Sequence, residues 1–469
     1  MKFINVKFLM RKFTHKIIIL LLSGLFLFSG VRIHIYHIND FHDNLFAPVG
    51  AAKIAHFLKN SGENHLFLVA GDFISGTAYG RATNGEASME VFYRYLNPDA
   101  IVIGNHEFDF GWQRLLELER KFPLPLISAN VLKDGKRLFP ESISFTIAGR
   151  VITVVGLTTT ETTISTFKKY IRGLEFRDEV TVAGELVKKY RNKTDLLILL
   201  SHCGIEKDRE IARKISGFDL IIGGHDHIKV NEKINSTQIV QAASYGRYMG
   251  EVIVEFNGNT KNISARLIPM KYYISKDVET EAYLKKLSSR LSSFLNRFCC
   301  TNPRAFEYNE ERIRSMQDPW AHFLARALKK SLSVDAVIIN AGAIRGGLPS
   351  GKIYYKHWLK VYPFQGQIMV LKIKGKYLKK ALLKHSSLKV PTTAYLQMEG
   401  ITISAGKEIF VNGKPLKEER LYRVLIPEFL YMGGDGYTMF KNANSFHYVN
   451  MTFPEFFFAY FSRKGRITN

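Results

Sequence analysis

The stretch IVIGNHEFDFG, residues 101–111, joins a short apolar run to a cluster of polar side chains. Its β-branched start predicts a buried strand, and the glycine that follows permits a turn. Asn105, His106 and Asp109 should therefore gather just beyond the end of the strand, where α/β sheets bind their ligands. An amide oxygen, an imidazole and a carboxylate can supply a metal ligand, a proton donor and a group that fixes the tautomer of that donor. Taken alone, the motif also fits an ordinary polar turn after a strand.

Further apolar segments end in the same way, in potential metal ligands. The segments are expected to be strands at 31–40, 65–76, 195–204 and 218–227. The ligands that follow them are Asp40, His42, Asp72, His202, His225 and His227. Packing alone does not explain so many strand ends that each finish in a hard or borderline metal ligand.

Helical patterns alternate with these strands, and a second region of strands and helices follows. The helices are expected at 49–60, 81–97, 182–191 and 206–216, with further strands at 123–131 and 150–159. An apolar stripe over 277–298 predicts a connecting helix. Beyond it, the expected strands are 334–342, 366–375 and 420–430, and the expected helices 319–331 and 375–385. No internal repeat, low-complexity tract or dinucleotide-binding GxGxxG motif is visible in the sequence.

The length of 469 residues indicates two or three domains, and residues 1–30 form a separate leader. A basic start is followed by the apolar run IIILLLSGLFLF and two small residues, which is the layout of a secretory signal. The alternative is a membrane anchor formed by residues 17–29, because Phe28 is a poor residue three positions before a cut after Gly30. Export is the favoured interpretation.

The formal net charge of +24 suits an anionic substrate, an anionic membrane surface or nucleic acid, and does not choose among them. The chain has only three cysteines, Cys203, Cys299 and Cys300. A disulfide-stapled fold is therefore excluded, even for an exported protein.

Five motifs give the first region its resemblance to a known family. They are DFH (40–42), GD (71–72), GNHEFD (104–109), SH (201–202) and GHDH (224–227). In this order they resemble the calcineurin-like metallophosphoesterases. With NAGAIR (340–345), PF (363–364) and FLYMGGDGY (429–437) added, nearly all of residues 31–440 is similar to the bacterial 5′-nucleotidases of the UshA type, which are related to vertebrate ecto-5′-nucleotidase.

This resemblance implies a four-layer αββα metallophosphoesterase domain over 31–272, a linker helix over 273–300 and an α/β substrate-binding domain over 301–469. It also implies two divalent ions (Zn, Mn or Co) that neutralise a phosphate and activate water for in-line attack. One ion would be held by Asp40, His42, Asp72 and His227, and the other by Asp72, Asn105, His202 and His225. His106 would stabilise developing charge or protonate the leaving oxygen, with Asp109 orienting its ring.

The resemblance also implies a nucleotide site in the second region. The residues are Arg314 and Arg345 for phosphate, Asn340 for the base, Phe364 and Phe429 as rings that stack on the base, and Asp435 for the ribose. Two departures from the family pattern stand out. The segment QDPWAHF (317–323) breaks the usual helix-start motif and leaves the position of Arg314 open, and His227 takes a ligand position that is Gln in some relatives.

Together these features predict a periplasmic or secreted two-metal phosphomonoesterase that acts on nucleoside 5′-monophosphates, with nucleotide sugars or 2′,3′-cyclic nucleotides as further substrates. Within the same architecture, the alternative is a sulfur-oxidation hydrolase of the SoxB type with a dimanganese site. A metal-dependent nuclease and a metal-free surface-binding module are the alternatives from other classes. No nucleic-acid partner and no membrane contact beyond the leader are expected, and the oligomeric state stays open.

Overall fold

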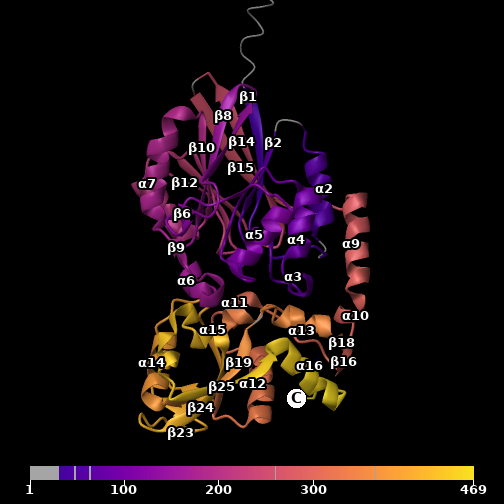
Figure 1. The fold of residues 1–469 in the computed structure, drawn as a ribbon, viewed down its shortest axis with the longest axis vertical. Helices are drawn as coiled ribbons and strands as arrows, with labels where there is room; N and C mark the ends of the chain where they lie inside the picture. The colour runs from indigo at the N-terminus through magenta and orange to yellow at the C-terminus, as the bar shows by residue number, and fades with distance from the viewer. Residues whose placement is uncertain (1–30, 47–48, 63–64, 259, 365, 469) are drawn as a thin grey trace, which may run out of the picture.

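The computed structural model describes residues 31–46, 49–62, 65–258, 260–364 and 366–468. Its N-terminal and C-terminal halves are stacked along the long axis of the molecule (Figure 1). Helices α9 (Val278–Arg290) and α10 (Ser292–Leu295) run along one side and join them. The leader, with the alternative anchor inside it, lies outside the described residues. Within those residues, no helix is long and apolar enough to cross a membrane.

Two six-stranded mixed sheets form the centre of the N-terminal half. In the first sheet the order is β15 (Thr260–Pro269), β14 (Tyr248–Asn257), β1 (Val31–Ile38), β2 (His65–Ala70), β3 (Ala100–Val102) and β4 (Leu126–Ile127). In the second it is β12 (Lys229–Ile234), β13 (Thr237–Ala242), β11 (Leu220–Ile222), β10 (Leu196–His202), β8 (Arg150–Thr158) and β7 (Ser142–Ile147). The neighbours from β1 to β4, and those among β8, β10, β11 and β13, are parallel. Parallel strands carry their carboxyl ends to one edge of a sheet, where the candidate ligands follow.

The two sheets pack face to face, and helices cover both outer faces. Ile33 and Ile35 of β1 lie in a core shared with Val154 and Ile198 of the second sheet. The alternate residues of β1 point outward against helices, because successive side chains of a strand face opposite sides. Helices α2 (Ala51–Lys59), α4 (Glu86–Val91) and α5 (Trp112–Lys121) cover the outer face of the first sheet, and α7 (Glu179–Tyr190) and α8 (Ile205–Lys214) cover that of the second. The predicted αββα architecture is confirmed.

A five-stranded sheet forms the centre of the C-terminal half. Its order is β20 (Leu396–Glu399), β17 (Ala336–Asn340), β24 (Leu421–Pro427), β19 (Gln367–Lys374) and β25 (Ser445–Thr452). One face packs against α12 (Pro319–Leu332), α13 (Tyr355–Val361) and α16 (Phe453–Lys464), and the other against α14 (Gly375–Ser386). This half is therefore an α/β unit with its own cores.

Shorter elements complete both halves. The short helices are α3 (Ala78–Thr83), α6 (Thr162–Ser165), α11 (Glu310–Ile313) and α15 (Glu428–Tyr431). One small sheet in the N-terminal half consists of β5 (Val131–Lys133), β6 (Lys136–Arg137) and β9 (Leu174–Phe176). Two more consist of β16 (Phe298–Asn302) and β18 (Gly351–Tyr354), and of β21 (Ile401–Ile403), β22 (Ile409–Val411) and β23 (Lys414–Pro415).

The connecting helix is shorter than the apolar stripe over 277–298 predicts. Helix α9 ends at Arg290, a second short helix follows, and Phe298 already begins a strand that pairs with β18. The end of α9 is rich in serine, which forms helix less readily than Ala, Leu or Lys. As a result Phe294 and Phe298 are 42% and 53% exposed, and only the earlier part of the stripe and Leu295 pack on the fold.

Candidate active site

The polar residues that follow five parallel strands meet at one edge of the two large sheets. Three sets of donor atoms each lie within 4.8 Å of one another. They are the sets Asp40–His42–His227, His42–Asp72–His106 and Asp72–His202–His225. Six of the seven sequence-predicted metal ligands therefore come together in overlapping groups, in which His42 joins the first set to the second and Asp72 joins the second to the third.

The backbone of the ligand loops is held in an uncommon conformation. Positive φ angles of 49°, 50°, 53°, 91° and 62° occur at Asp40, His42, Asp72, His225 and His227, respectively. Non-glycine residues rarely adopt such angles, and those that do cluster at functional sites. The loops also hold one another, since the backbone N–H of His42 donates to the carbonyl of Asp72 at 2.8 Å.

Two glycines allow the loops to approach each other closely. A Cβ atom on Gly104 would collide with the carboxylate of Asp72 and the ring of His202. A Cβ atom on Gly224 would collide with the carbonyl oxygen of Ala70. Glycine at these positions leaves room for the ligand side chains.

The backbone fixes the ring of His202 in the orientation that a metal ligand would need. Its Nδ1 lies 2.7 Å from the carbonyl oxygen of Ala70, which can only accept, so Nδ1 carries the proton. Its fully buried Nε2 has no hydrogen bond of good geometry and lies 3.1 Å from Asp72 Oδ2. Burial raises the pKa of Asp72, but the charges of His202 and His106 outweigh burial and hold this pKa well below its usual value. Asp72 is therefore a carboxylate, as metal binding requires.

The other donors face one another in the same manner. His42 Nε2 lies 2.9 Å from His227 Nε2, and Asp40 Oδ1 lies 3.4 Å from the same atom of His227. Burial, and then the neighbouring His227, lower the pKa of His42 well below its usual value, so this ring is neutral, as an imidazole that binds a metal must be. His225 Nδ1 lies 3.2 Å from Asn105 Oδ1. Carboxylate, imidazole and amide donors of this kind fit divalent ions such as Zn²⁺ and Mn²⁺.

His106 lies beside the ligands with its ring fixed by Asp109. His106 Nδ1 is 2.8 Å from Asp109 Oδ2, and Asp109 also accepts a hydrogen bond from Ser75 Oγ at 2.6 Å. Burial lowers the pKa of His106, but the carboxylates of Asp109 and Asp72 outweigh burial and raise it. The ring can therefore hold a proton on Nε2, the nitrogen that faces the C-terminal half.

Sequence reasoning gave no role to Glu107, which organises the ligand loops. Its buried carboxylate accepts hydrogen bonds from the backbone N–H groups of Gly104, Asp72 and Phe73, at 2.6, 2.9 and 2.8 Å. Burial, and then the Asp72 carboxylate, raise the pKa of Glu107 to about 7. The sequence did offer a signal for this role, because Glu107 lies inside the motif of residues 101–111.

Asn39, also without a predicted role, fixes Asp40. Its Nδ2 donates to Asp40 Oδ2 at 2.7 Å, and its Oδ1 accepts from the backbone N–H of Ala242 at 2.8 Å. The amide thus joins the end of β1 to the end of β13, and a lone Asn before a ligand gives no sequence signal of this contact.

Residues of the C-terminal half reach His106 directly. Arg345 Nη2 lies 3.5 Å from His106 Nε2. The ring of Phe364 lies nearly parallel to that of His106, with 6.0 Å between the ring centroids and 26° between the planes. The guanidinium of Arg345 lies 5.6 Å from the centroid of Phe364. A cation and an aromatic ring are therefore added to the ligand cluster.

The remaining predicted nucleotide residues form a second group. Asn340 Nδ2 donates to Asp435 Oδ2 at 2.9 Å, and burial raises the pKa of Asp435 to about 7. Phe429 is half-buried and contacts Phe167 of the N-terminal half edge to face, with 5.8 Å between ring centroids. Phe364 and Phe429 thus have different neighbours.

Arg314 has a defined position despite the divergent segment that follows it. The side chain of Asp318 accepts from the backbone N–H of Trp320 at 2.8 Å and caps α12, with Pro319 at its start. Asp before Pro is a favourable helix start, so QDPWAHF replaces one start signal by another. Arg314 Nη2 lies 2.8 Å from Glu310 Oε1.

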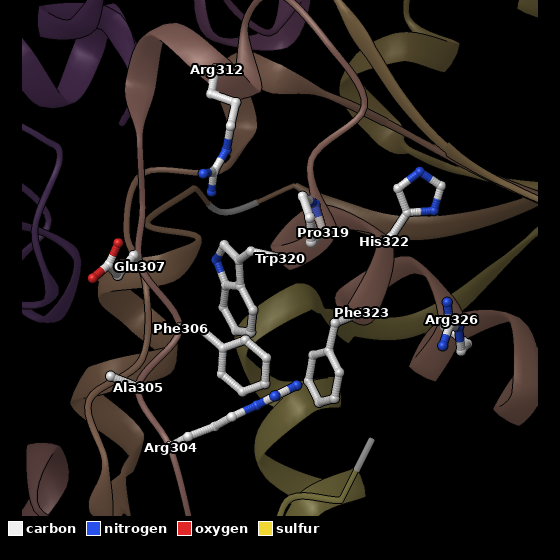
Figure 2. Close-up of a pocket in the computed structure, with 10 residues that line it drawn as sticks. All are labelled: Arg304, Ala305, Phe306, Glu307, Arg312, Pro319, Trp320, His322, Phe323 and Arg326. Carbon is white, nitrogen blue, oxygen red and sulfur yellow. The ribbon is translucent and has the colours of Figure 1, made fainter.

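Two cavities lie in the C-terminal half near these residues. One, of about 520 Å³, includes Tyr308, Arg345 and Lys360 in its lining. The other, of about 620 Å³, is lined by Phe306, Trp320 and Phe323, with arginines around them (Figure 2). None of the predicted site residues lines this second cavity, so it does not belong to the cluster around His106.

Comparison with known protein families agrees with a metal-binding site in the N-terminal half. The family model for calcineurin-like phosphoesterases matches residues 33–229, and these enzymes use divalent metal ions. The chain is a metallophosphoesterase of this class, a hydrolase that acts on phosphoric ester bonds. The model for the C-terminal domain of 5′-nucleotidases matches residues 301–442.

Individual relatives agree along the whole chain. A 5′-nucleotidase of Vibrio cholerae is 28% identical over 494 residues, which cover 90% of this chain and 88% of the relative. The structure of a 5′-nucleotidase precursor from Thermus thermophilus matches with a TM-score of 0.82, at 22% identity, over 93% of this chain and 97% of the other. The sulfate thiohydrolase SoxB of Thermus thermophilus matches with a TM-score of 0.79, at 20% identity, over 93% and 94% of the two chains. The chain therefore combines a calcineurin-like phosphoesterase domain with a 5′-nucleotidase C-terminal domain, as matched by the two family models.

Proposed function

We propose that this enzyme hydrolyses nucleoside 5′-monophosphates to a nucleoside and inorganic phosphate at a two-metal site. The observation that carries the proposal is the contact between halves, in which Arg345 and Phe364 approach His106. A phosphate between the ligand cluster and Arg345 would lie beside His106, and the nucleoside would extend into the C-terminal half.

The metal ligands are assigned in two sets. One ion would be held by Asp40, His42, Asp72 and His227, and the other by Asp72, Asn105, His202 and His225. When bound, such a pair of ions supplies Lewis-acid stabilisation of the phosphate and a nucleophile from water near neutral pH. The unpartnered Nε2 of His202 and the facing rings of His42 and His227 support this assignment.

The chain's own side chains supply the rest of the chemistry. His106 donates the proton on Nε2 to the leaving 5′-oxygen of the nucleoside, and Asp109 holds the ring in the orientation that this transfer needs. Arg345 neutralises charge on the phosphate, because a guanidinium donates to two phosphate oxygens at once. Arg314 adds a second cation, partly offset by Glu310.

The nucleoside would be held by the second group of residues. Phe364 and Phe429 offer aromatic faces on which any base can stack. Asp435 would accept hydrogen bonds from the ribose hydroxyls, and Asn340, which donates to Asp435, would contact the base. Nucleotide sugars and 2′,3′-cyclic nucleotides carry the same nucleoside and are proposed as further substrates.

The closest alternative is a hydrolase of the SoxB type. The fold does not separate the two, since the SoxB structure matches almost as well as the nucleotidase structure. Phe429 and Asp435 favour a nucleoside, because a thiosulfonate presents neither a base nor a ribose. A nuclease is less well supported, since the two phenylalanines and Asp435 suit a single nucleoside.

We also propose that the leader exports the enzyme to the periplasm or outside the cell. The basic start and the apolar run of residues 17–28 support cleavage by a signal peptidase, and retention by residues 17–29 is the alternative.

A panel of phosphate-release assays tests the proposal. Purified enzyme with Mn²⁺, Zn²⁺ or Co²⁺ would be given AMP, UDP-glucose, 2′,3′-cyclic AMP and a thiosulfonate at equal concentration. Inorganic phosphate should appear fastest from AMP. Turnover of the thiosulfonate with no release from any nucleotide would contradict the proposal and favour the SoxB-type alternative.

A further inference from the structure

Glu310 of the C-terminal half contacts a predicted metal ligand of the N-terminal half. Its Oε1 lies 3.3 Å from His227 Nδ1, and the opposite nitrogen of that ring faces His42 and Asp40. Both His227 Nδ1 and Glu310 Oε1 are buried, and neither makes a hydrogen bond of good geometry within the described part of the chain, although Oε1 also lies 2.8 Å from Arg314 Nη2. A small rotation of either side chain would align the pair.

The segment that carries Glu310 is fixed from its far side. Helix α11 is capped by Asn309, whose side chain accepts from the backbone N–H of Arg312 at 2.8 Å. Arg312 points away from His227 into the cavity of about 620 Å³ described above (Figure 2). Its Nε donates to Asp318 Oδ2 at 2.6 Å. The buried amide of Gln397 donates to the carbonyl of Ile313 at 2.6 Å. These hydrogen bonds hold the segment that presents Glu310 to His227.

A carboxylate in this position has a definite effect on an imidazole ligand. When one ring nitrogen binds a cation, the other carries a proton and donates it to an outer acceptor. A carboxylate acceptor fixes the ring orientation and makes the imidazole a better electron donor, and loss of such a partner typically weakens metal binding 10–100-fold.

We propose that Glu310 is a positioning residue that holds His227 for one of the two metal ions and, through Arg314, ties that ion to the phosphate-binding side of the C-terminal half. The inference rests on the metal ligands of the proposed function. It predicts unequal effects on the two ions, because Glu310 contacts His227 and none of the ligands assigned to the second ion alone.

The test is a metal titration of the stripped protein, followed by calorimetry with Mn²⁺, for wild type and Glu310→Gln. One of two binding constants should weaken 10–100-fold, and the other should stay unchanged. Glu311→Gln is the matched control, because this neighbour is exposed on the same short helix and should bind both ions as the wild type does. Equal constants in Glu310→Gln and wild type would overturn the proposal.

A double mutant separates positioning from a general structural role. In a His227→Ala background, adding Glu310→Gln should have no further effect on metal affinity, because its partner is already gone. A further loss in this background, or a lower melting temperature of the stripped Glu310→Gln protein, would show that Glu310 acts on the fold instead. Wild type that binds fewer than two ions would overturn the two-metal proposal itself, and Glu310 would then be judged on whichever ion His227→Ala removes.

Discussion

Replacing Phe429 with alanine should impair nucleotide hydrolysis while leaving simple phosphate esters almost unaffected. Phe429 lies beside Gly434 and contacts Phe167, and no contact joins it to His106 or Arg345 in the described structure. Stacking of a base on an aromatic ring contributes about 1–3 kcal/mol. At about 1.4 kcal/mol per tenfold, kcat/KM for AMP should fall roughly 5-fold to 150-fold. p-Nitrophenyl phosphate has no nucleoside, so its kcat/KM should change much less.

Phe364 should behave differently, because its ring lies against that of His106 and near Arg345. Phe364→Ala removes a stacking surface and also loosens the proton donor and the phosphate-binding cation. Hydrolysis of AMP and of p-nitrophenyl phosphate should both fall, with the larger loss on AMP.

The readout is the ratio of kcat/KM for the two substrates in each variant. Phe446→Ala is the matched control, since Phe446 is 46% exposed on β25 and has no predicted role in the site. Thermal melting checks that the fold is intact. Equal losses on both substrates in Phe429→Ala, with a lowered melting temperature, would refute the reasoning and mean that the ring only packs.

Other changes test the remaining roles. Asp72→Asn should abolish turnover and reduce metal content by elemental analysis without unfolding the protein, and full activity with both ions bound would contradict the bridging assignment. His106→Asn should lower kcat by roughly 10²–10⁴-fold with metal content unchanged, while loss of metal would make His106 a ligand. Because burial raises the pKa of Asp435 to about 7, kcat/KM for AMP relative to p-nitrophenyl phosphate should fall as pH drops through 7 and the carboxylate is protonated, and Asp435→Asn should flatten this profile. After expression in a Gram-negative host, the protein should be found in the periplasm starting near Val31, and recovery from the membrane with Met1 intact would favour the anchor.

Local patterns in the sequence predicted the main strands and the place where the candidate ligands meet, whereas the αββα layers were anticipated through the family resemblance. Strands buried on both faces appear as continuous apolar runs, and parallel strands bring the residues after them to one edge. The position of Arg345 beside His106 was anticipated only through the family resemblance, since no local pattern relates residues so distant in the chain.

Features that depend on single backbone conformations or long-range pairing were not predicted. The helical pattern over 81–97 is broken because Asn84 and Gly85 both adopt left-handed backbone angles between α3 and α4. The β14–β15 hairpin went unrecognised, although β14 pairs with β1 and widens the first sheet. The contact of Glu310 with His227 joins residues from different halves, and an acid in a polar segment carries no signal of such a partner.

The central claim is a two-metal nucleotidase, and metal-dependent phosphate release from AMP tests it most directly. Chelator-stripped enzyme should release no phosphate, and stepwise addition of Mn²⁺ should restore activity fully only as two equivalents are bound. Full activity of the stripped enzyme or with a single equivalent would contradict the two-metal site. Absence of AMP hydrolysis with both ions bound would contradict the nucleotidase itself.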